Sequence, residues 1–357
     1  MSKILITGGT GFVGYHLAKR LSDQNHEVVV ADNFFRSERD EDLKKLLERP
    51  NITLIEADLT LPASWEKLGS GYDHVYHLVG INGTKLFYEI PHEVLRIGVT
   101  STLNALDWFR LKNNKKNAKI LYTSSNEAYA GALEAFDKLP IPTPENVPLV
   151  IADPYNPRWS YAGQKLIGEL LFIHYAKAYN FRMSIVRPHN FYGPREGYLH
   201  VIPEIIERIK DKPDPFPIFG SDDTRSFCHI DDAIEAIQPV MESDKTDGGT
   251  YHIGTHEETL ISDLIDTMFD LMKWRPKNLD IKKSPEGSVK RRLPDVSKIK
   301  KDLGWQAKIG LKEGLQTMID WYLAHPKPKA QKNALQKKQA KQIAKKKVLK
   351  KNPGAKK

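Results

Sequence analysis

The chain contains a single cysteine, Cys228, among 357 residues. One cysteine cannot form an intramolecular disulfide, so a disulfide-stabilised scaffold is excluded and a reducing compartment is favoured. The sequence also lacks an apolar run long enough to cross a bilayer, and the residues after Met1 do not have the pattern of a signal peptide. We therefore expect a cytoplasmic protein without membrane insertion, large enough to form a two-lobed enzyme.

Acidic residues and arginine are absent from residues 326–357, which contain 13 lysines. Without these lysines the formal net charge of +9 becomes −4, so the rest of the chain is mildly acidic. A segment rich in Lys, Gln and Ala cannot bury enough apolar surface to fold alone, and its composition predicts disorder or a loose helix. We expect either weak contact with polyanions such as RNA or a purely solubilising role.

A short apolar run at residues 3–7 leads directly into a glycine-rich segment, Gly8-Gly9-Thr10-Gly11-Phe12-Val13-Gly14. An amphipathic helix follows, because apolar residues recur at helical spacing after Gly11. Glycines between a strand and a helix let the backbone turn tightly and approach phosphates, while the helix N-terminus faces the anion. This arrangement predicts a dinucleotide-binding loop.

The next strand, residues 27–31, ends at Asp32. An acid about 20 residues beyond the glycine loop binds the adenosine ribose hydroxyls and repels a 2′-phosphate, which favours NAD over NADP. Arg36 and Arg39 follow closely, so NADP stays open at this point.

Further strands are expected at 52–57, 74–79 and 119–123, and the first two end at Asp58 and Gly80. The carboxyl ends of parallel strands meet at one edge of a sheet, where open α/β folds bind ligands. Strands that alternate with helical patterns predict an α/β fold with a Rossmann-like doubly wound parallel sheet.

The second half of the chain predicts a smaller C-terminal α/β substrate lobe. Its expected elements are helices at 201–210, 231–242, 260–273 and 311–323 and a strand at 250–253. We therefore divide the chain into a dinucleotide-binding domain at 1–188, a substrate lobe at 189–325 from which some segments return to the first domain, and the tail at 326–357.

Asp231 and Asp232 are expected to cap a helix. His74 and His77 point to opposite faces of a strand, so no metal site is expected.

Tyr161 and Lys165 are one helical turn apart and share a helix face. A phenol beside an ammonium group ionises more easily, and phenolate is a base near neutrality. The pair therefore predicts a proton acceptor for alcohol oxidation. Ser125 and Glu127 follow the strand at 119–123, where a hydroxyl can bind the reacting alcohol and a carboxylate can act as acid or base; a simple turn is the alternative.

Together these residues resemble the extended short-chain dehydrogenase/reductase proteins, in particular the nucleotide-sugar epimerase, dehydratase and decarboxylase group. The resemblance runs from residue 3 to about residue 324. It continues through the segments 187–195, 224–232, 291–295 and 303–305.

The resemblance implies that Tyr161 is the catalytic base, with Lys165 as its pKa modulator and as a ligand of the nicotinamide ribose. Ser125 would be the hydroxyl partner and Glu127 the second acid or base. The implied NAD contacts are Gly8, Gly11, Phe12, Val13, Gly14, Asp32, Asn33, Asp58, Leu59, Leu78, Val79, Gly80, Tyr161, Lys165 and Pro188. The implied contacts of a nucleotide-diphosphate sugar are Asn126, Asn190, Arg225, Arg291 and Arg292. A homodimer, packed through helices near 89–110 and 158–180, is also implied.

Enzymes of this group work through a transient 4-keto sugar, which permits epimerisation, dehydration or decarboxylation. The 4,6-dehydratases usually have an aspartic acid at the position of Asn126, and an amide cannot protonate a departing hydroxyl. Glu127 matches the decarboxylases, Asn126 departs from them, and simple 4-epimerases usually lack the glutamate.

The stretches 157–169 and 197–203 resemble epimerase-type enzymes of surface polysaccharide pathways. We expect an NAD-dependent nucleotide-sugar epimerase, with a UDP-glucuronate-type decarboxylase as the alternative and a 4,6-dehydratase behind it. Two other classes stay open: an NADP-dependent carbonyl reductase, and an RNA-binding protein that retains the fold.

Overall fold

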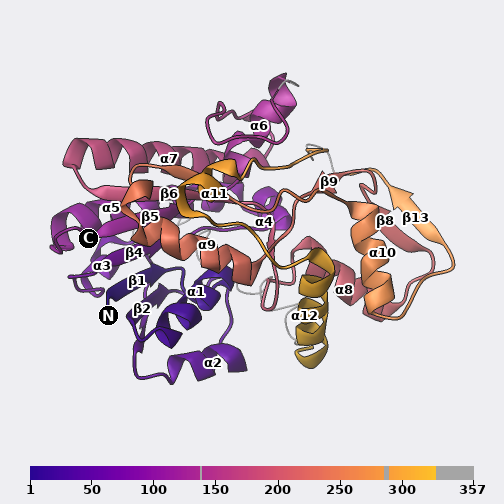
Figure 1. The fold of residues 1–357 in the computed structure, drawn as a ribbon, viewed down its shortest axis with the longest axis horizontal. Helices are drawn as coiled ribbons and strands as arrows, with labels where there is room; N and C mark the ends of the chain where they lie inside the picture. Colours follow the sequence, from indigo (N-terminus) through magenta and orange to yellow (C-terminus); the bar gives the residue numbers. More distant parts are fainter. Residues whose placement is uncertain (137–138, 285–288, 327–357) are drawn as a thin grey trace, which may run out of the picture.

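A seven-stranded parallel sheet in the order β11-β6-β5-β4-β1-β2-β3 forms the centre of the molecule (Figure 1). The computed structural model describes residues 1–136, 139–284 and 289–326, so the lysine-rich tail beyond Pro326 lies outside the described residues. The strands of this sheet are β1 (Lys3–Thr7), β2 (Glu27–Asp32), β3 (Ile52–Glu56), β4 (His74–His77), β5 (Lys119–Thr123), β6 (Arg182–Pro188) and β11 (Thr250–Ile253). The predicted α/β fold with a doubly wound parallel sheet is confirmed.

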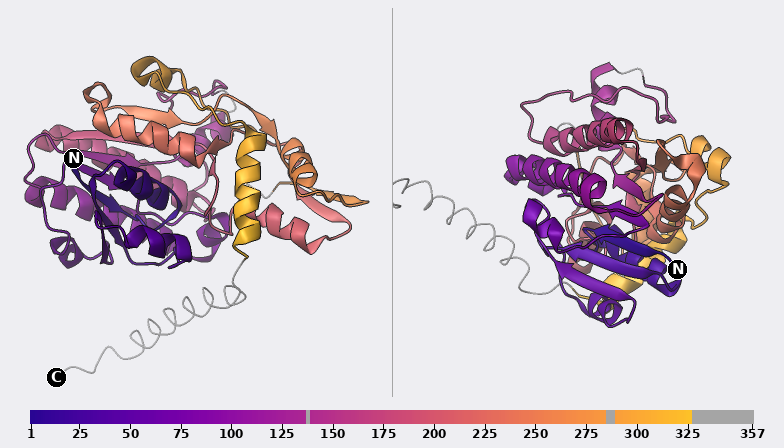
Figure 2. Two further views of the ribbon diagram at one scale, coloured as in Figure 1. Left: turned by 60° about the horizontal axis from the view of Figure 1, so that its bottom comes forward. Right: turned by 90° about the vertical axis from the view of Figure 1, so that its left-hand side faces the viewer.

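Helices cover both faces of the sheet, which explains why its strands are apolar throughout (Figures 1 and 2). Ile4 and Ile6 of β1 pack toward one face and Leu5 toward the other. The first face is covered by α1 (Phe12–Asp23), α9 (Ile230–Glu242) and α11 (Ser297–Leu303). The second is covered by α3 (Pro62–Glu66), α5 (Pro91–Lys112) and α7 (Trp159–Tyr179).

The helix predicted from residue 89 begins later, at Pro91. Ile90 leaves the helical conformation with φ −138° and ψ 48°, and it separates α4 (Thr84–Glu89) from α5. Proline at the first position of α5 fits this break, because its missing N–H would have no helical partner there. The remaining helices of this part are α2 (Glu41–Leu47) and α6 (Glu127–Phe136).

A second, smaller core lies at one end of the molecule, to the right in Figure 1. It is built from α8 (Val201–Asp211), α10 (Ile261–Leu271), α12 (Leu311–Ala324) and the parallel pair β8 (Phe216–Phe219) and β13 (Leu279–Lys282). Two short strand pairs, β7 (Phe191–Tyr192) with β10 (Cys228–His229) and β9 (Thr224–Arg225) with β12 (Thr259–Leu260), connect the two parts. A 3-10 turn, η1 (Asp244–Thr246), precedes β11.

The prediction that Asp231 and Asp232 cap α9 is wrong. The side chain of His229 accepts from the backbone N–H of Asp231 and therefore caps this helix. Asp232 instead accepts from the backbone N–H groups of Lys308 and Ile309, at 3.0 and 2.8 Å. Its carboxylate connects α9 to a distant segment of the chain.

No helix of the described segments is both long and apolar enough to cross a bilayer. Several apolar side chains on α5 and α7 are exposed, among them Leu111, Leu170 and Ile173. The homodimer and the cytoplasmic location stay predictions.

α7 packs closely on the sheet because it carries glycine at position 168. A Cβ atom at Gly168 would lie 2.0 Å from the hydroxyl of Tyr122, which is buried in β5 and stacked on Phe172. Tyr122 cannot move aside easily, so the glycine sets the distance between α7 and β5.

We expect Gly168→Ala to lower the free energy of unfolding by about 1–3 kcal/mol, because the added methyl group overpacks a filled core. Gly163→Ala in the same helix is the matched control, since its Cβ would meet only Leu95 and Ile151, at 3.7 and 3.9 Å. Urea unfolding of both variants measures the difference. Equal stability of the two variants would contradict this account of the packing.

Candidate active site

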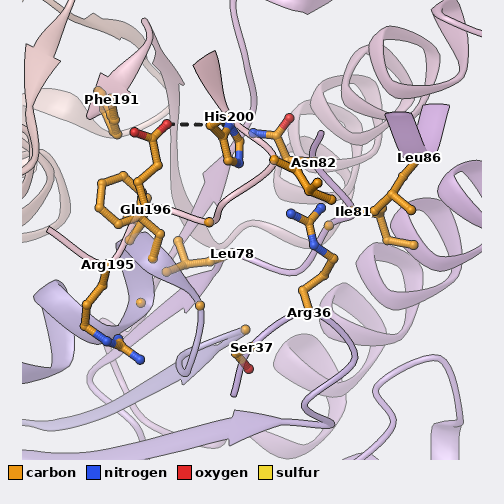
Figure 3. A pocket seen from close by; sticks show the side chains of 18 of the residues that line it. Arg36, Ser37, Leu78, Ile81, Asn82, Leu86, Phe191, Arg195, Glu196 and His200 are labelled. Carbon is orange, nitrogen blue, oxygen red and sulfur yellow. Dashed lines mark ion pairs between the residues drawn. The ribbon is translucent and has the colours of Figure 1, made fainter. Parts of the chain in front are cut away.

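A cavity of about 1060 Å³ lies along the carboxyl edge of the sheet. Every predicted NAD contact lines it, as do Ser125, Asn126, Glu127, Asn190 and Arg292. The parallel strands explain this convergence, because the segments after β1 to β6 all leave the sheet at the same edge. Figure 3 shows part of this cavity from close by.

The glycine-rich loop forms a tight cradle at the start of α1. Gly8 has φ +72°, in the left-handed region that favours glycine. A Cβ atom at Gly14 would lie 2.5 Å from the Cα atom of Gly9, so only glycine permits this close approach. The cradle fits a pyrophosphate group, which needs backbone N–H groups at short range.

Asp32 is held at the rim of this cradle. Its carboxylate accepts from the backbone N–H groups of Thr10 and Phe34, at 3.1 and 2.9 Å. An anion at this position fits the ribose hydroxyls of NAD and opposes a 2′-phosphate. Arg39 is bound to Glu56 at 2.5 Å and lies over the ring of Phe34.

Tyr161 of α7 lies in an apolar environment at the edge of the cavity. Its ring stacks on Phe87 with centroids 4.8 Å apart. Burial raises the pKa of the Tyr161 phenol above its ordinary value; Ser125 and Arg36 act to lower it and Glu127 acts to raise it. The phenol is therefore neutral in this structure at neutral pH.

Lys165 lies beside Tyr161 but donates to the backbone, and its effect on the pKa of the phenol stays a prediction. Its ammonium group donates to the carbonyl of Thr123 at 2.6 Å and lies 5.7 Å from the Tyr161 ring centroid. Burial lowers the pKa of Lys165 to about 8, against the attraction of Glu169. Both side chains line the cavity from the same face of α7.

Glu127 forms an ion triad with Arg158 and Arg292. The carboxylate lies 3.1 Å from Arg158 and 2.5 Å from Arg292, and all three side chains are at most 18% exposed. Burial alone would raise the pKa of Glu127, but the two guanidinium groups lower it below its ordinary value. Glu127 is therefore an anion, and the triad carries one net positive charge.

Ser125 and Asn126 present polar groups between this triad and Tyr161. The Ser125 hydroxyl donates to the side-chain oxygen of Asn126 at 3.3 Å. The Asn126 amide nitrogen is buried, and no hydrogen-bond partner for it exists within the described parts of the chain. It can donate to a ligand in the cavity.

Of the residues predicted to bind the substrate diphosphate, some line the cavity and others lie outside it. Asn190 lines the cavity with φ +41°, and its amide donates to the carbonyl of Ser226 at 2.8 Å. Arg225 and Arg291 are not part of the lining, because each is directed to other groups. Arg225 lies 3.4 Å from Asp223, and Arg291 is bound to Glu258 at 2.6 Å on the surface.

Sequence reasoning did not assign Arg158 or Arg36 to the site. Arg158 precedes Tyr161 by three residues, and this spacing puts two side chains on one helix face, so the sequence contained a usable signal. From the sequence alone, Arg36 is a candidate only for contact with a 2′-phosphate. Its guanidinium group lies elsewhere, near Gly83 and Gly197.

A sequence model described as the NAD dependent epimerase/dehydratase family matches residues 4–254. The chain belongs to this family. The prediction of NAD as its cofactor is thereby confirmed at the level of the family, and so is the predicted class of nucleotide-sugar epimerases, decarboxylases and dehydratases.

Named relatives of this family member include two decarboxylases. UDP-glucuronic acid decarboxylase 6 of Arabidopsis thaliana is 33% identical over 322 residues, which cover 88% of this chain and 87% of the relative. UDP-N-acetyl-alpha-D-glucosaminuronate decarboxylase of Bacillus cytotoxicus is 30% identical over 330 residues, which cover 90% of this chain and 97% of the relative.

Solved structures of the family share this fold. UDP-glucuronic acid 4-epimerase from Bacillus cereus, in complex with UDP-glucuronic acid and NAD, has a TM-score of 0.79 at 25% identity and covers 90% of this chain and 99% of that chain. UDP-glucose 4-epimerase from Thermotoga maritima, with UDP-glucose, has the same TM-score and identity, over 91% and 100%.

In this family member, Lys165→Met should raise the free energy of unfolding near pH 7 by on the order of 2 kcal/mol. The pKa of Lys165 is about 8 in the folded chain and 10.5 ordinarily, so the unfolded chain binds the proton more tightly and folding becomes more favourable as pH rises through this range. Removing the buried charge gains about 3 kcal/mol, and losing the hydrogen bond to Thr123 costs about 1.

Urea unfolding at about pH 7 and about pH 10 measures this effect. The advantage of the methionine variant should shrink at the higher pH. Lys177→Met, at an exposed position of the same helix, is the control and should change stability little. An advantage that is independent of pH would contradict the assignment of a buried charge to Lys165.

Proposed function

We propose that this enzyme removes carbon dioxide from a nucleotide-linked uronic acid, such as UDP-glucuronate, through a transient 4-keto sugar. The ion triad of Glu127, Arg158 and Arg292 carries this proposal. Its net positive charge lies at the cavity beside Tyr161, where it would attract a substrate carboxylate. The names of both relatives in Arabidopsis and Bacillus cytotoxicus support the same reaction.

The glycine-rich loop and Asp32 support NAD as the cofactor. The glycine cradle would hold the pyrophosphate, and Asp32 the adenosine ribose. When bound, NAD accepts a hydride and brings a positively charged nicotinamide ring, which lowers the pKa of a neighbouring phenol. Lys165 would hold the nicotinamide ribose from its position beside Gly80.

Oxidation begins at the C4 hydroxyl of the sugar. Tyr161 takes the hydroxyl proton as C4 loses its hydride, and Ser125 positions the same hydroxyl by hydrogen bonding. The amide nitrogen of Asn126 is free to bind a sugar oxygen. The raised pKa of Tyr161 in this structure means that proton removal depends on positive charge added by the bound ligands.

The C4 ketone makes the sugar a β-keto acid. Loss of carbon dioxide breaks the C5–C6 bond, and the electron pair moves into an enolate whose oxygen Tyr161 can protonate. A proton from solvent adds at C5 while the enol oxygen returns its proton to Tyr161. Reduction of the C4 ketone, with Tyr161 donating the proton to O4 and the cofactor supplying the hydride, would complete the product. Because Glu127 is ionised, it is not the donor of a proton; its charge opposes tight binding of the carboxylate before it leaves.

Epimerisation at C4, which the sequence favours over decarboxylation, is the second candidate. The Bacillus cereus neighbour is by name a 4-epimerase of UDP-glucuronic acid, so a uronate can take either course in proteins of this fold. Turning the ketone over before the hydride returns would give the epimer with its carboxylate intact. Dehydration is disfavoured, because Asn126 cannot protonate a departing hydroxyl.

Incubation with UDP-glucuronate tests the proposal directly. We expect release of carbon dioxide and formation of a UDP-pentose, followed by NMR. Tyr161→Phe should keep its affinity for NAD, because the ring still packs on Phe87, but should lose turnover by roughly 100- to 10,000-fold. Formation of UDP-galacturonate without carbon dioxide would establish the epimerase instead, and unchanged turnover in Tyr161→Phe would refute the role of the phenol.

Glu127→Gln should slow the loss of carbon dioxide more than the oxidation. Removing the anion leaves both guanidinium groups to bind the substrate carboxylate, which stabilises it before it leaves. We expect the KM for UDP-glucuronate to stay constant or fall while kcat falls by about tenfold or more. Absorbance of reduced nicotinamide in a single turnover separates the two steps; if no reduced nicotinamide forms, Glu127 acts in the oxidation itself.

A further inference from the structure

Arg36 is a cation in the cavity without a counterion. It lies in the segment after β2, and its guanidinium group points into the cavity (Figure 3). Nη1 is buried with no hydrogen-bond partner, and among the side chains described at 1–132, 139–284 and 289–326 no carboxylate forms an ion pair with Arg36. A buried guanidinium group without a partner is costly to maintain, so its presence points to a ligand.

Two glycines leave room for this side chain. A Cβ atom at Gly83 would lie 3.4 Å from Nη1, and one at Gly197 would lie 3.8 Å from Nη2. The neighbouring Ser37 is bonded to Thr10 of the glycine-rich loop at 2.5 Å, which anchors the segment. Arg36 therefore extends from the phosphate cradle toward the reacting end of the cavity.

The polar groups nearest to Arg36 do not neutralise it. His200 lies next to Glu196, with Nδ1 3.5 Å from Oε1 (Figure 3). Burial, assisted by Arg36, lowers the pKa of His200 to about 4, and burial raises the pKa of Glu196 well above its ordinary value. His200 is therefore uncharged near pH 7, and burial favours the protonated form of Glu196. Burial lowers the pKa of Arg36 itself to about 10, so Arg36 is still a cation near pH 7.

We propose that Arg36 binds an oxyanion of a ligand in the part of the cavity between Asn82 and His200. A guanidinium group offers several donors in one plane, which suits phosphate and carboxylate oxygens. This subsite is distinct from the ion triad, whose cations are engaged with Glu127. Two ligands carry such a group here: the dinucleotide, with its pyrophosphate, and the nucleotide sugar, with its diphosphate or carboxylate.

Binding to the full chain tests the subsite without turnover. The proposal rests on the proposed function only in the choice of UDP ligands as probes. Calorimetry compares NAD, ADP-ribose, UDP, UDP-glucose and UDP-glucuronate, all in the Tyr161→Phe chain. Arg36→Gln removes the charge and Arg36→Lys keeps it, while Arg39→Gln is the matched control, because Arg39 lies in the same segment and is bound to Glu56.

We expect Arg36→Gln to weaken at least one ligand by about tenfold or more, with part of the affinity restored in Arg36→Lys. Equal losses for NAD and ADP-ribose assign the dinucleotide pyrophosphate. Losses for all three UDP ligands assign the substrate diphosphate, and a loss for UDP-glucuronate alone assigns the carboxylate. Any of these results supports the subsite.

Losses no larger than those of Arg39→Gln for all five ligands, in a variant with an unchanged melting curve, would overturn the proposal. If Arg36→Gln does not fold, the affinities of Arg36→Lys are compared with those of the parent chain instead. An ammonium group fits an oxyanion less well than a guanidinium group, so the affinity should still fall. If the parent chain binds NAD but no UDP ligand, the proposed function fails. The measurements with NAD and ADP-ribose still decide whether Arg36 binds the dinucleotide.

Discussion

The contact between α7 and the central sheet is the constraint on which the site depends. Gly168 lets the helix approach the hydroxyl of Tyr122 in β5, and Glu169 forms a buried ion pair with Arg187 of β6 at 2.7 Å. Both contacts lie within about one turn of Lys165, so they hold the face of α7 that carries Tyr161 and Lys165 against the carboxyl edge of the sheet. A helix that stood further from the sheet would take Tyr161 away from the glycine-rich loop and the strand ends that line the cavity.

Burial and charge act in opposite directions within this cavity, and the result differs from group to group. Burial prevails at Tyr161, which stays a neutral phenol, and at Lys165, whose pKa falls to about 8. Charge prevails at Glu127, because two guanidinium groups lie within 3.1 Å of its carboxylate. The cavity therefore combines a neutral proton carrier with fixed positive charge, which suits substrates and cofactors that are anionic.

Positive charge is distributed over two places that the chain brings together from distant segments. Arg292 reaches Glu127 across 165 positions of sequence, and Arg36 approaches the loops at Gly83 and Gly197. Neither the position of Arg292 nor that of Arg36 can be predicted from neighbouring residues in the sequence, because each depends on how the second lobe packs against the first. Arg158 is different: its spacing from Tyr161 is local, and only its partner is distant.

The sequence by itself determined strands β1 to β5 of the sheet, the glycine cradle, Asp32 and the shared face of Tyr161 and Lys165, but not that β6 and β11 complete the sheet. These features follow from hydrophobic periodicity, from turns that only glycine adopts, and from polar residues at strand ends, all of which act over short distances along the chain. Only the tertiary structure decided that Arg292 rather than Arg291 lines the cavity, that Glu127 is an anion, and that Lys165 is directed to a backbone carbonyl. Those outcomes depend on burial and on charges from remote segments, and such long-range terms exist only once the chain is folded.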